Sequence, residues 1–73
     1  MRAIWEFEIT QKFEGIGEKY YIESFIGKED LYQTLVERIP RWKRQVIEND
    51  DQTEHSCVKV TVLSAKKICD LTT

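Results

Sequence analysis

Three residues of the sequence are candidate metal ligands: His55, Cys57 and Cys69. Zinc needs four ligands, or three and a water molecule, and its protein ligands usually come in closely spaced pairs. A single His-x-Cys with one distant cysteine does not match that spacing. We therefore expect no metal and no cofactor. Two cysteines are also too few for a disulfide framework, and we expect reduced thiols, although a single bridge is compatible with the sequence.

A second candidate site is a basic segment that surrounds Trp42. Its cations are Arg38, Arg41, Lys43 and Arg44. Cations beside an aromatic ring can bind phosphates and stack on bases, so this segment, 38–44, is the candidate nucleic-acid site. However, Glu37 and Arg41 form an oppositely charged pair at i, i+4 spacing, and Arg44 and Glu48 form another. Such pairs are typical of a solvated helix face, so nucleic-acid binding is the alternative function and not the leading one.

The sequence offers little for catalysis or for nucleotide binding. Gly15-x-Gly17 has Tyr20 where a dinucleotide fingerprint needs its third glycine, and it joins two predicted strands instead of opening a helix. There is one histidine, and the sequence sets no Cys/His arrangement and no nucleophile elbow. The acidic residues are predicted on exposed faces, where little would shift their pKa values. We therefore expect a protein that is not an enzyme and has no small-molecule substrate.

Length and composition favour a single small domain over residues 1–73. Hydrophobic residues make up 41% of the chain and charged residues 33%, which is an ordinary globular mixture. A core of this size leaves only about 3–5 kcal/mol of net stability unless a partner contributes. The net charge of -2 argues against binding to nucleic acid that is driven by charge.

The expected location of the chain is the cytoplasm. The sequence has no apolar run long enough to span a bilayer, so we expect no membrane association. Residues 1–10 alternate charged and bulky side chains and lack the continuous apolar region of a signal peptide.

Two β-strands are predicted before the helix, and their register decides which face is buried. Residues 3–13 alternate, with Trp5, Phe7, Ile9 and Phe13 on one face. A second strand-like run covers 20–26, after the turn signal of Gly15 and Gly17. A turn at 15–17 would place Glu23 on the buried face, opposite Ile9. Shifting this pairing by one residue places Phe7 opposite Ile26 and exchanges the faces of the second strand. Burial of apolar side chains favours the shifted pairing, so Tyr21, Glu23 and Phe25 are predicted to point outward.

Residues 28–47 are the segment with sustained helical periodicity. Its apolar stripe contains Leu31, Leu35, Ile39, Trp42 and Val46, widened by Tyr32, Val36 and Ile47. Gly27 is the predicted N-cap. Pro40 disfavours helical geometry, so the helix either kinks there or ends near Arg38. The stripe stays in phase across Pro40, which favours a kink or two nearly continuous helices, and a strand over 44–48 is the alternative.

The predicted fold is α+β, a two-layer β-β-α-β domain with a three-stranded antiparallel sheet. Residues 48–54 read as an exposed loop, and residues 57–63 as the third strand. Residues 65–71 are either an extension of that strand or a short turn of helix. A right-handed crossover gives the strand order 2-1-3, with the helix on one face. Lys59 is then expected near Glu6 and Glu8 on the open face.

The open face of the sheet is the expected partner-binding site because no helix is left to cover it. The residues assigned to this site are Ile4, Glu6, Glu8, Tyr21, Glu23 and Phe25. Aromatic side chains among scattered charges are typical of recognition surfaces, although isolated exposed aromatics are also common on strands. We expect a protein-interaction module, either self-associating as a homodimer or binding another protein.

In size and layout the chain resembles the compact α+β accessory proteins of phages and mobile elements. Some of those proteins inhibit enzymes of their host. The resemblance implies an accessory inhibitor of a partner protein as one form of the interaction module.

Overall fold

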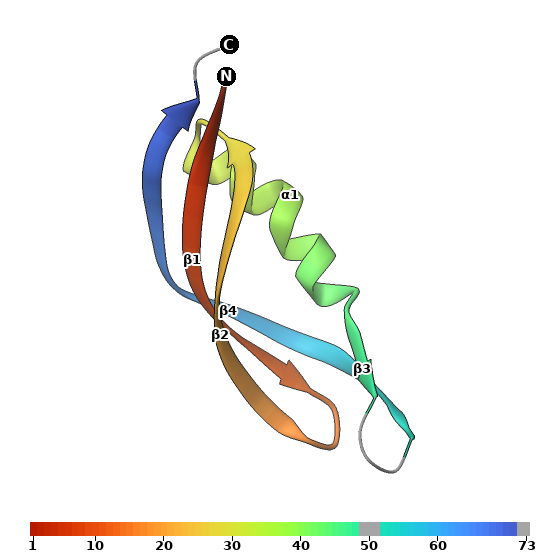
Figure 1. The fold of residues 1–73 in the computed structure, drawn as a ribbon. Helices are drawn as coiled ribbons and strands as arrows, with labels where there is room; N and C mark the ends of the chain where they lie inside the picture. Colours follow the sequence, from red (N-terminus) through yellow and green to blue (C-terminus); the bar gives the residue numbers. More distant parts are fainter. Residues whose placement is uncertain (49–51, 72–73) are drawn as a thin grey trace.

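The computed structural model describes residues 1–48 and 52–71 of the chain. In chain order its elements are β1 (Arg2–Phe13), β2 (Gly17–Lys28), α1 (Leu31–Lys43), β3 (Val46–Glu48) and β4 (Glu54–Leu71). The strands form one antiparallel sheet in the order β2-β1-β4-β3, which curls around α1 (Figure 1). The α+β class is therefore confirmed. The predicted three-stranded sheet is wrong in detail, because a fourth strand, β3, extends it beyond β4.

β1 supplies the centre of the core because it lies between two long strands and under the helix. The side chains that β1 points inward are buried, which confirms the predicted face of this strand. They are Ala3, Trp5, Phe7, Ile9 and Phe13. Trp42 of α1 is 1% exposed, and its ring lies 5.7 Å from the ring of Phe7. The assignment of Trp42 to the core is confirmed as well. Burial of large aromatic side chains is the main source of stability in a core this small.

The register of β2 differs from the prediction, and the difference exchanges the faces of the whole strand. Phe13 pairs with Gly17 and Phe7 pairs with Glu23, so the turn consists of residues 14–16. Gly15 and Gly17 both have φ of 89°, a conformation that favours glycine and that fixes this tight turn. Tyr21, Glu23 and Phe25 therefore lie on the side of α1 and not on the open face. The outer residues of β2 include Ile22 and Ile26, which are both 55% exposed.

The helix begins later and ends earlier than predicted. Asp30 is the N-cap, and its Oδ2 accepts a hydrogen bond of 2.9 Å from the backbone N–H of Gln33. Gly27, the predicted N-cap, belongs to β2. A Cβ there would lie 2.8 Å from Cγ2 of Thr34, so the absence of a side chain lets helix and strand pack closely.

Both interpretations of the segment after Pro40 are partly correct. α1 continues through Pro40 and ends at Lys43, in agreement with the in-phase stripe. Val46 and Ile47 do not extend that stripe, because they belong to β3, which pairs with the start of β4. The strand that was the alternative for 44–48 therefore exists at Val46–Glu48.

β4 is much longer than the predicted strand over 57–63. It extends to Leu71, so the open choice for residues 65–71 resolves to strand. Its register against β1 shifts at three places, leaving Val58, Leu63 and Ile68 as extra residues. Such bulges bend a strand and increase its twist, which accounts for the curl of the sheet in Figure 1.

The shifts in β4 also change the expected charge pairing on the open face. Lys59 lies opposite Lys12, not near Glu6 or Glu8. Lys66 is the residue opposite Glu6. The predicted pairing of Lys59 is therefore wrong, because it assumed a strand with no bulges.

The described part of the chain is elongated and exposes more surface than its size requires. It measures 46 × 18 × 17 Å with a radius of gyration of 13.9 Å, against about 11 Å for a compact domain of this length. Its accessible surface is 5185 Å², whereas a monomer of this mass typically has about 4,700 Å². Within residues 1–48 and 52–71, no helix has the length and apolar character needed to cross a membrane.

Candidate protein-interaction surface

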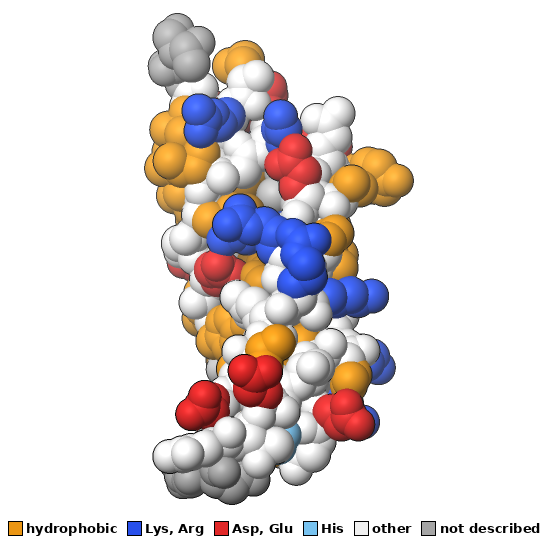
Figure 2. All heavy atoms as spheres, turned by 90° about the vertical axis from the view of Figure 1, so that its right-hand side faces the viewer, with side chains coloured by type: hydrophobic (Ala, Val, Ile, Leu, Met, Phe, Trp, Pro, Cys, Tyr) orange, Lys and Arg blue, Asp and Glu red, His pale blue; other side chains and the backbone are white. Residues whose placement is uncertain are grey.

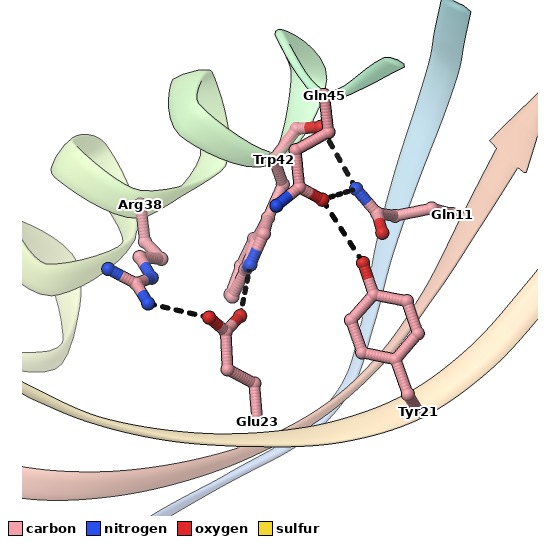
Figure 3. Close-up of polar contacts among 6 residues, drawn as sticks. All are labelled: Gln11, Tyr21, Glu23, Arg38, Trp42 and Gln45. Carbon is pink, nitrogen blue, oxygen red and sulfur yellow. Dashed lines mark hydrogen bonds and ion pairs between the residues drawn. The ribbon is translucent and has the colours of Figure 1, made fainter. Parts of the chain in front are cut away.

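Glu23 is the centre of a polar network that joins β2 to α1 (Figure 3). Its carboxylate accepts a hydrogen bond of 2.6 Å from Nη2 of Arg38 and another from the indole N–H of Trp42. The side chains of Arg38 and Glu23 are only 17% and 29% exposed. The guanidinium carbon of Arg38 also lies 3.9 Å from the centre of the Phe25 ring, as in a cation–π contact. These groups bind one another and hold α1 on the sheet.

A second part of the network joins the end of α1 to β1. The side-chain amide of Gln11, which is fully buried, donates to the carbonyl of Trp42 at 2.9 Å and to Oε1 of Gln45 at 2.8 Å. The hydroxyl of Tyr21 donates to the same Oε1 at 3.3 Å. Burial raises the pKa of Tyr21, and the nearby charge of Glu23 raises it further. Gln11 lies on the buried face of β1, between Ile9 and Phe13, but its partners come from distant segments and give no local signal in the sequence.

The six residues predicted to bind a partner do not form one surface. Tyr21, Glu23 and Phe25 lie on the side of the sheet that α1 covers, and Phe25 packs against the core. Their assignment to the open face is wrong because it depended on the wrong register of β2. The other three, Ile4, Glu6 and Glu8, alternate with the buried residues of β1 and lie on the opposite face.

The open face of the sheet mixes apolar and polar groups. Ile4 has Ile26 beside it on β2, but the next pair toward the turn is Glu6 and Ser24. The hydroxyl of Tyr20 donates a hydrogen bond of 2.7 Å to Glu8, and this bond raises the pKa of Tyr20. Polar rows therefore interrupt the apolar surface of this face.

The basic segment is only partly available to a ligand. Arg38 is held by Glu23, and Trp42 is buried, so its ring cannot stack on a base in this structure. Arg41, Lys43 and Arg44 are exposed at the end of α1. Lys and Arg side chains form a band across the face shown in Figure 2.

The candidate metal ligands are not gathered into a site. Nδ1 of His55 lies 2.7 Å from the backbone carbonyl of Glu14. Cys57 is buried, Cys69 is exposed, and both are free thiols. Over the described ranges, no group of three or more His, Cys, Asp and Glu residues is arranged to hold a metal ion.

A row of apolar side chains on α1 forms a continuous uncovered surface. We call it the α1 stripe, and it consists of Tyr32, Leu35, Val36, Ile39 and Pro40. These residues line a shallow hollow of about 450 Å³. Tyr32 is 74% exposed and Val36 is 54% exposed, whereas Leu35 and Ile39 are partly buried against the core. The stripe therefore begins at the core and continues into solvent.

The contacts of α1 explain why this flank of the helix stays uncovered. The hydroxyl of Thr34 lies 2.8 Å from the carbonyl of Asp30 and 3.1 Å from that of Lys28, the last residue of β2, and Arg38 binds Glu23, so one flank faces β2. At about 100° per residue, Val36 lies about 160° around the helix from both Thr34 and Arg38. The flank that carries the stripe therefore faces away from β2. Residues 63–70 of β4 are exposed as well.

Comparison with family models, curated proteins and solved structures gives no match. The surface is therefore assigned from its own geometry. The sequence pattern predicted four residues of the stripe, Tyr32, Leu35, Val36 and Ile39, as apolar helix positions that cover the sheet. The signal was the width of the apolar face: Tyr32 and Val36 widened it beyond the part that a single sheet can cover.

Proposed function

We propose that the chain is a small, non-enzymatic protein-interaction module whose binding surface is the α1 stripe. The observation that carries the proposal is the exposure of Tyr32 and Val36 in a continuous apolar row on one helix. Soluble proteins often recognise a partner through the apolar face of a helix, with residues at i, i+3, i+4 and i+7 as the main contacts. Tyrosine is among the residues that contribute most to such contacts.

The large exposed surface of so small a domain supports the same proposal. A domain of this size has about 3–5 kcal/mol of net stability from its own core. A partner that binds only the folded chain adds stability in proportion to the logarithm of its concentration over its Kd. Covering Tyr32 and Val36 would remove apolar surface from water and would favour the folded state.

Nucleic-acid binding through residues 38–44 is the second candidate function. The exposed cations Arg41, Lys43 and Arg44 favour it. Against it are the net charge of -2, the burial of Trp42 and the pairing of Arg38 with Glu23. We rank it below protein binding for these reasons. Inhibition of a partner enzyme and residence in the cytoplasm are compatible with the proposal, and they depend on the identity of the partner.

The test compares three immobilised forms of the chain in a pull-down from a lysate of the native host. They are the wild type, Val36→Glu in the stripe, and Ile22→Glu on the open face as a control of equal exposure. We expect the wild type and Ile22→Glu to retain the same protein, either a host protein or a second copy of the chain, and Val36→Glu to lose it. Retention of every bound protein by Val36→Glu would contradict the proposal.

A separate measurement addresses the nucleic-acid candidate. Titration with single- and double-stranded oligonucleotides at physiological salt should give negligible affinity. A micromolar affinity that falls steeply with salt, and that is abolished by Arg41→Glu with Arg44→Glu, would rank nucleic acid above protein as the partner.

A further inference from the structure

We infer that the occupant of the α1 stripe is a second copy of this chain, with the two α1 helices packed antiparallel about a two-fold axis at Val36. The inference rests on the proposed function, because it names the partner of the same surface. A two-fold axis makes the same patch serve both subunits, so the patch must be complementary to itself. The α1 stripe and the charges at its two ends meet that requirement.

The apolar part of the stripe is symmetric about its centre. Tyr32, Val36 and Pro40 are spaced evenly, four residues apart, and rows of this spacing form the ridges that interlock when helices pack. Reversal about Val36 places Tyr32 against Pro40 of the second copy and Val36 against the same residue of the second copy. Each exposed apolar side chain then meets an apolar side chain.

The charges at the ends of α1 favour the antiparallel arrangement. Glu29 and Asp30 precede the first turn, and Arg41, Lys43 and Arg44 lie at the last turn and just beyond it. In an antiparallel pair, the acidic end of each helix lies beside the basic end of the other. A parallel pair would place like charges together. The helix dipoles also attract one another only when the helices are antiparallel.

This order of features is the reason for choosing a second copy over an unrelated partner. Read along α1, acidic residues come first, then the apolar stripe, then basic residues, and the reversed helix presents the complement of each part. Glu37, beside the stripe, pairs with Lys28 at 3.8 Å. Antiparallel pairing with a second copy uses all three parts, whereas an unrelated partner would need only the apolar centre. The open face has no such order, since its apolar and polar rows alternate.

The decisive experiment uses the prediction that Val36 faces its own counterpart. Val36→Glu and Val36→Lys each place two like charges together at the axis, and each should weaken self-association by at least about 100-fold. A mixture of the two variants pairs glutamate with lysine and should form a heterodimer. Sedimentation velocity measures the mass of each sample, and native mass spectrometry with a small mass tag on one variant identifies the heterodimer.

Matched controls separate the interface from folding. Glutamate and lysine are good helix formers, so both Val36 variants should keep the far-UV circular dichroism spectrum of the wild type. Ile22→Glu and Ile22→Lys, at a site of nearly equal exposure on the open face, should self-associate like the wild type.

Three results would overturn the inference. If the single variants still form dimers, the chain associates through another surface. If each variant is monomeric but the mixture forms no heterodimer, Val36 does not lie at a two-fold axis. If the wild type is monomeric at high concentration, the second copy is not the partner; the proposed function then stands only if the wild type retains another protein that Val36→Glu loses.

Discussion

Replacement of Glu23 by alanine tests the structure most directly, because the register of β2 decides what this residue contacts. In the structure, Glu23 accepts hydrogen bonds from Arg38 and from the indole of Trp42. Had Phe7 paired with Ile26, Glu23 would lie on the open face and would contact neither. The effect of Glu23→Ala on stability therefore distinguishes the two registers.

The expected loss follows from the two contacts. A hydrogen bond to a charged group contributes about 1.5–3 kcal/mol, so the indole of Trp42 accounts for a loss of that size. An exposed ion pair contributes about 0–1 kcal/mol, and breaking a buried pair costs about 3–5 kcal/mol. The pair of Arg38 and Glu23, at 17% and 29% exposure, lies between these limits, and we take about 1.5–2 kcal/mol for it. The total is about 3–5 kcal/mol, which equals the net stability of a domain this small.

We therefore expect Glu23→Ala to be largely unfolded at 25 °C. Glu23→Gln keeps an oxygen that can accept from the indole of Trp42 but loses the charge, so it should lose about 1–2 kcal/mol. Urea denaturation followed by the fluorescence of Trp5 and Trp42 measures both variants. Glu6→Ala, on the opposite face, is the control and should lose less than about 1 kcal/mol. Equal losses for Glu23→Ala and Glu6→Ala would refute the register and, with it, the placement of Tyr21 and Phe25.

Four further predictions concern the covered face of the sheet, the helix proline and two tyrosines. Tyr21→Ser with Phe25→Ser removes two aromatics from the covered face and should abolish the folded far-UV spectrum; a retained spectrum would contradict their burial. Pro40→Ala removes an interior helix proline and should raise the free energy of unfolding by up to about 3 kcal/mol, whereas a loss would mean that the proline ring is needed at the end of α1. Glu8→Gln should lower the pKa of Tyr20 toward its ordinary value of 10.0 in a spectrophotometric titration, because the hydrogen bond to Glu8 is the main cause of its raised pKa. Because the pKa of Tyr21 is raised in the folded state, the stability that Tyr21 contributes is fully present below pH 10 and is lost as pH rises through the raised pKa. Urea midpoints should therefore fall in strongly alkaline buffer.

The sequence predicted β1 well because a central strand with one covered face shows its burial directly in its alternation. The faces of β2 were not predictable in the same way. They depend on the turn, where the left-handed conformation of Gly15 and Gly17 makes the connection tight. They also depend on Glu23, which looked unsuitable for a covered face. Its partners are Arg38 and Trp42, and no local pattern shows that a helix 15 to 19 residues away will neutralise a carboxylate.

The ends of the elements were harder to predict than their existence. The in-phase stripe correctly indicated a helix through Pro40, but hydrophobic spacing could not show that Val46 changes to a strand that pairs with Ser56. The length of β4 was hidden by its bulges. Val58, Leu63 and Ile68 each shift the alternation by one residue, so no single period continues through the strand.

The candidate surface was missed for a related reason. The sequence identified Tyr32 and Val36 as apolar helix positions and assigned them to the core, which assumes a helix centred over its sheet. The contacts of Thr34 with Lys28 and of Arg38 with Glu23 instead turn the opposite flank of α1 toward β2. These contacts join α1 to another element, so they are not visible in the pattern of one helix.

The position of α1 links the stability of the fold to the exposure of its surface. Arg38 and Trp42 of α1 both bind Glu23, so the flank of the helix that carries Arg38 is fixed against β2. Val36 lies about 160° around the helix from Arg38, so the same contacts direct Val36 away from β2. The residues that lie on the covered face because of the register of β2 therefore also help to leave the α1 stripe uncovered.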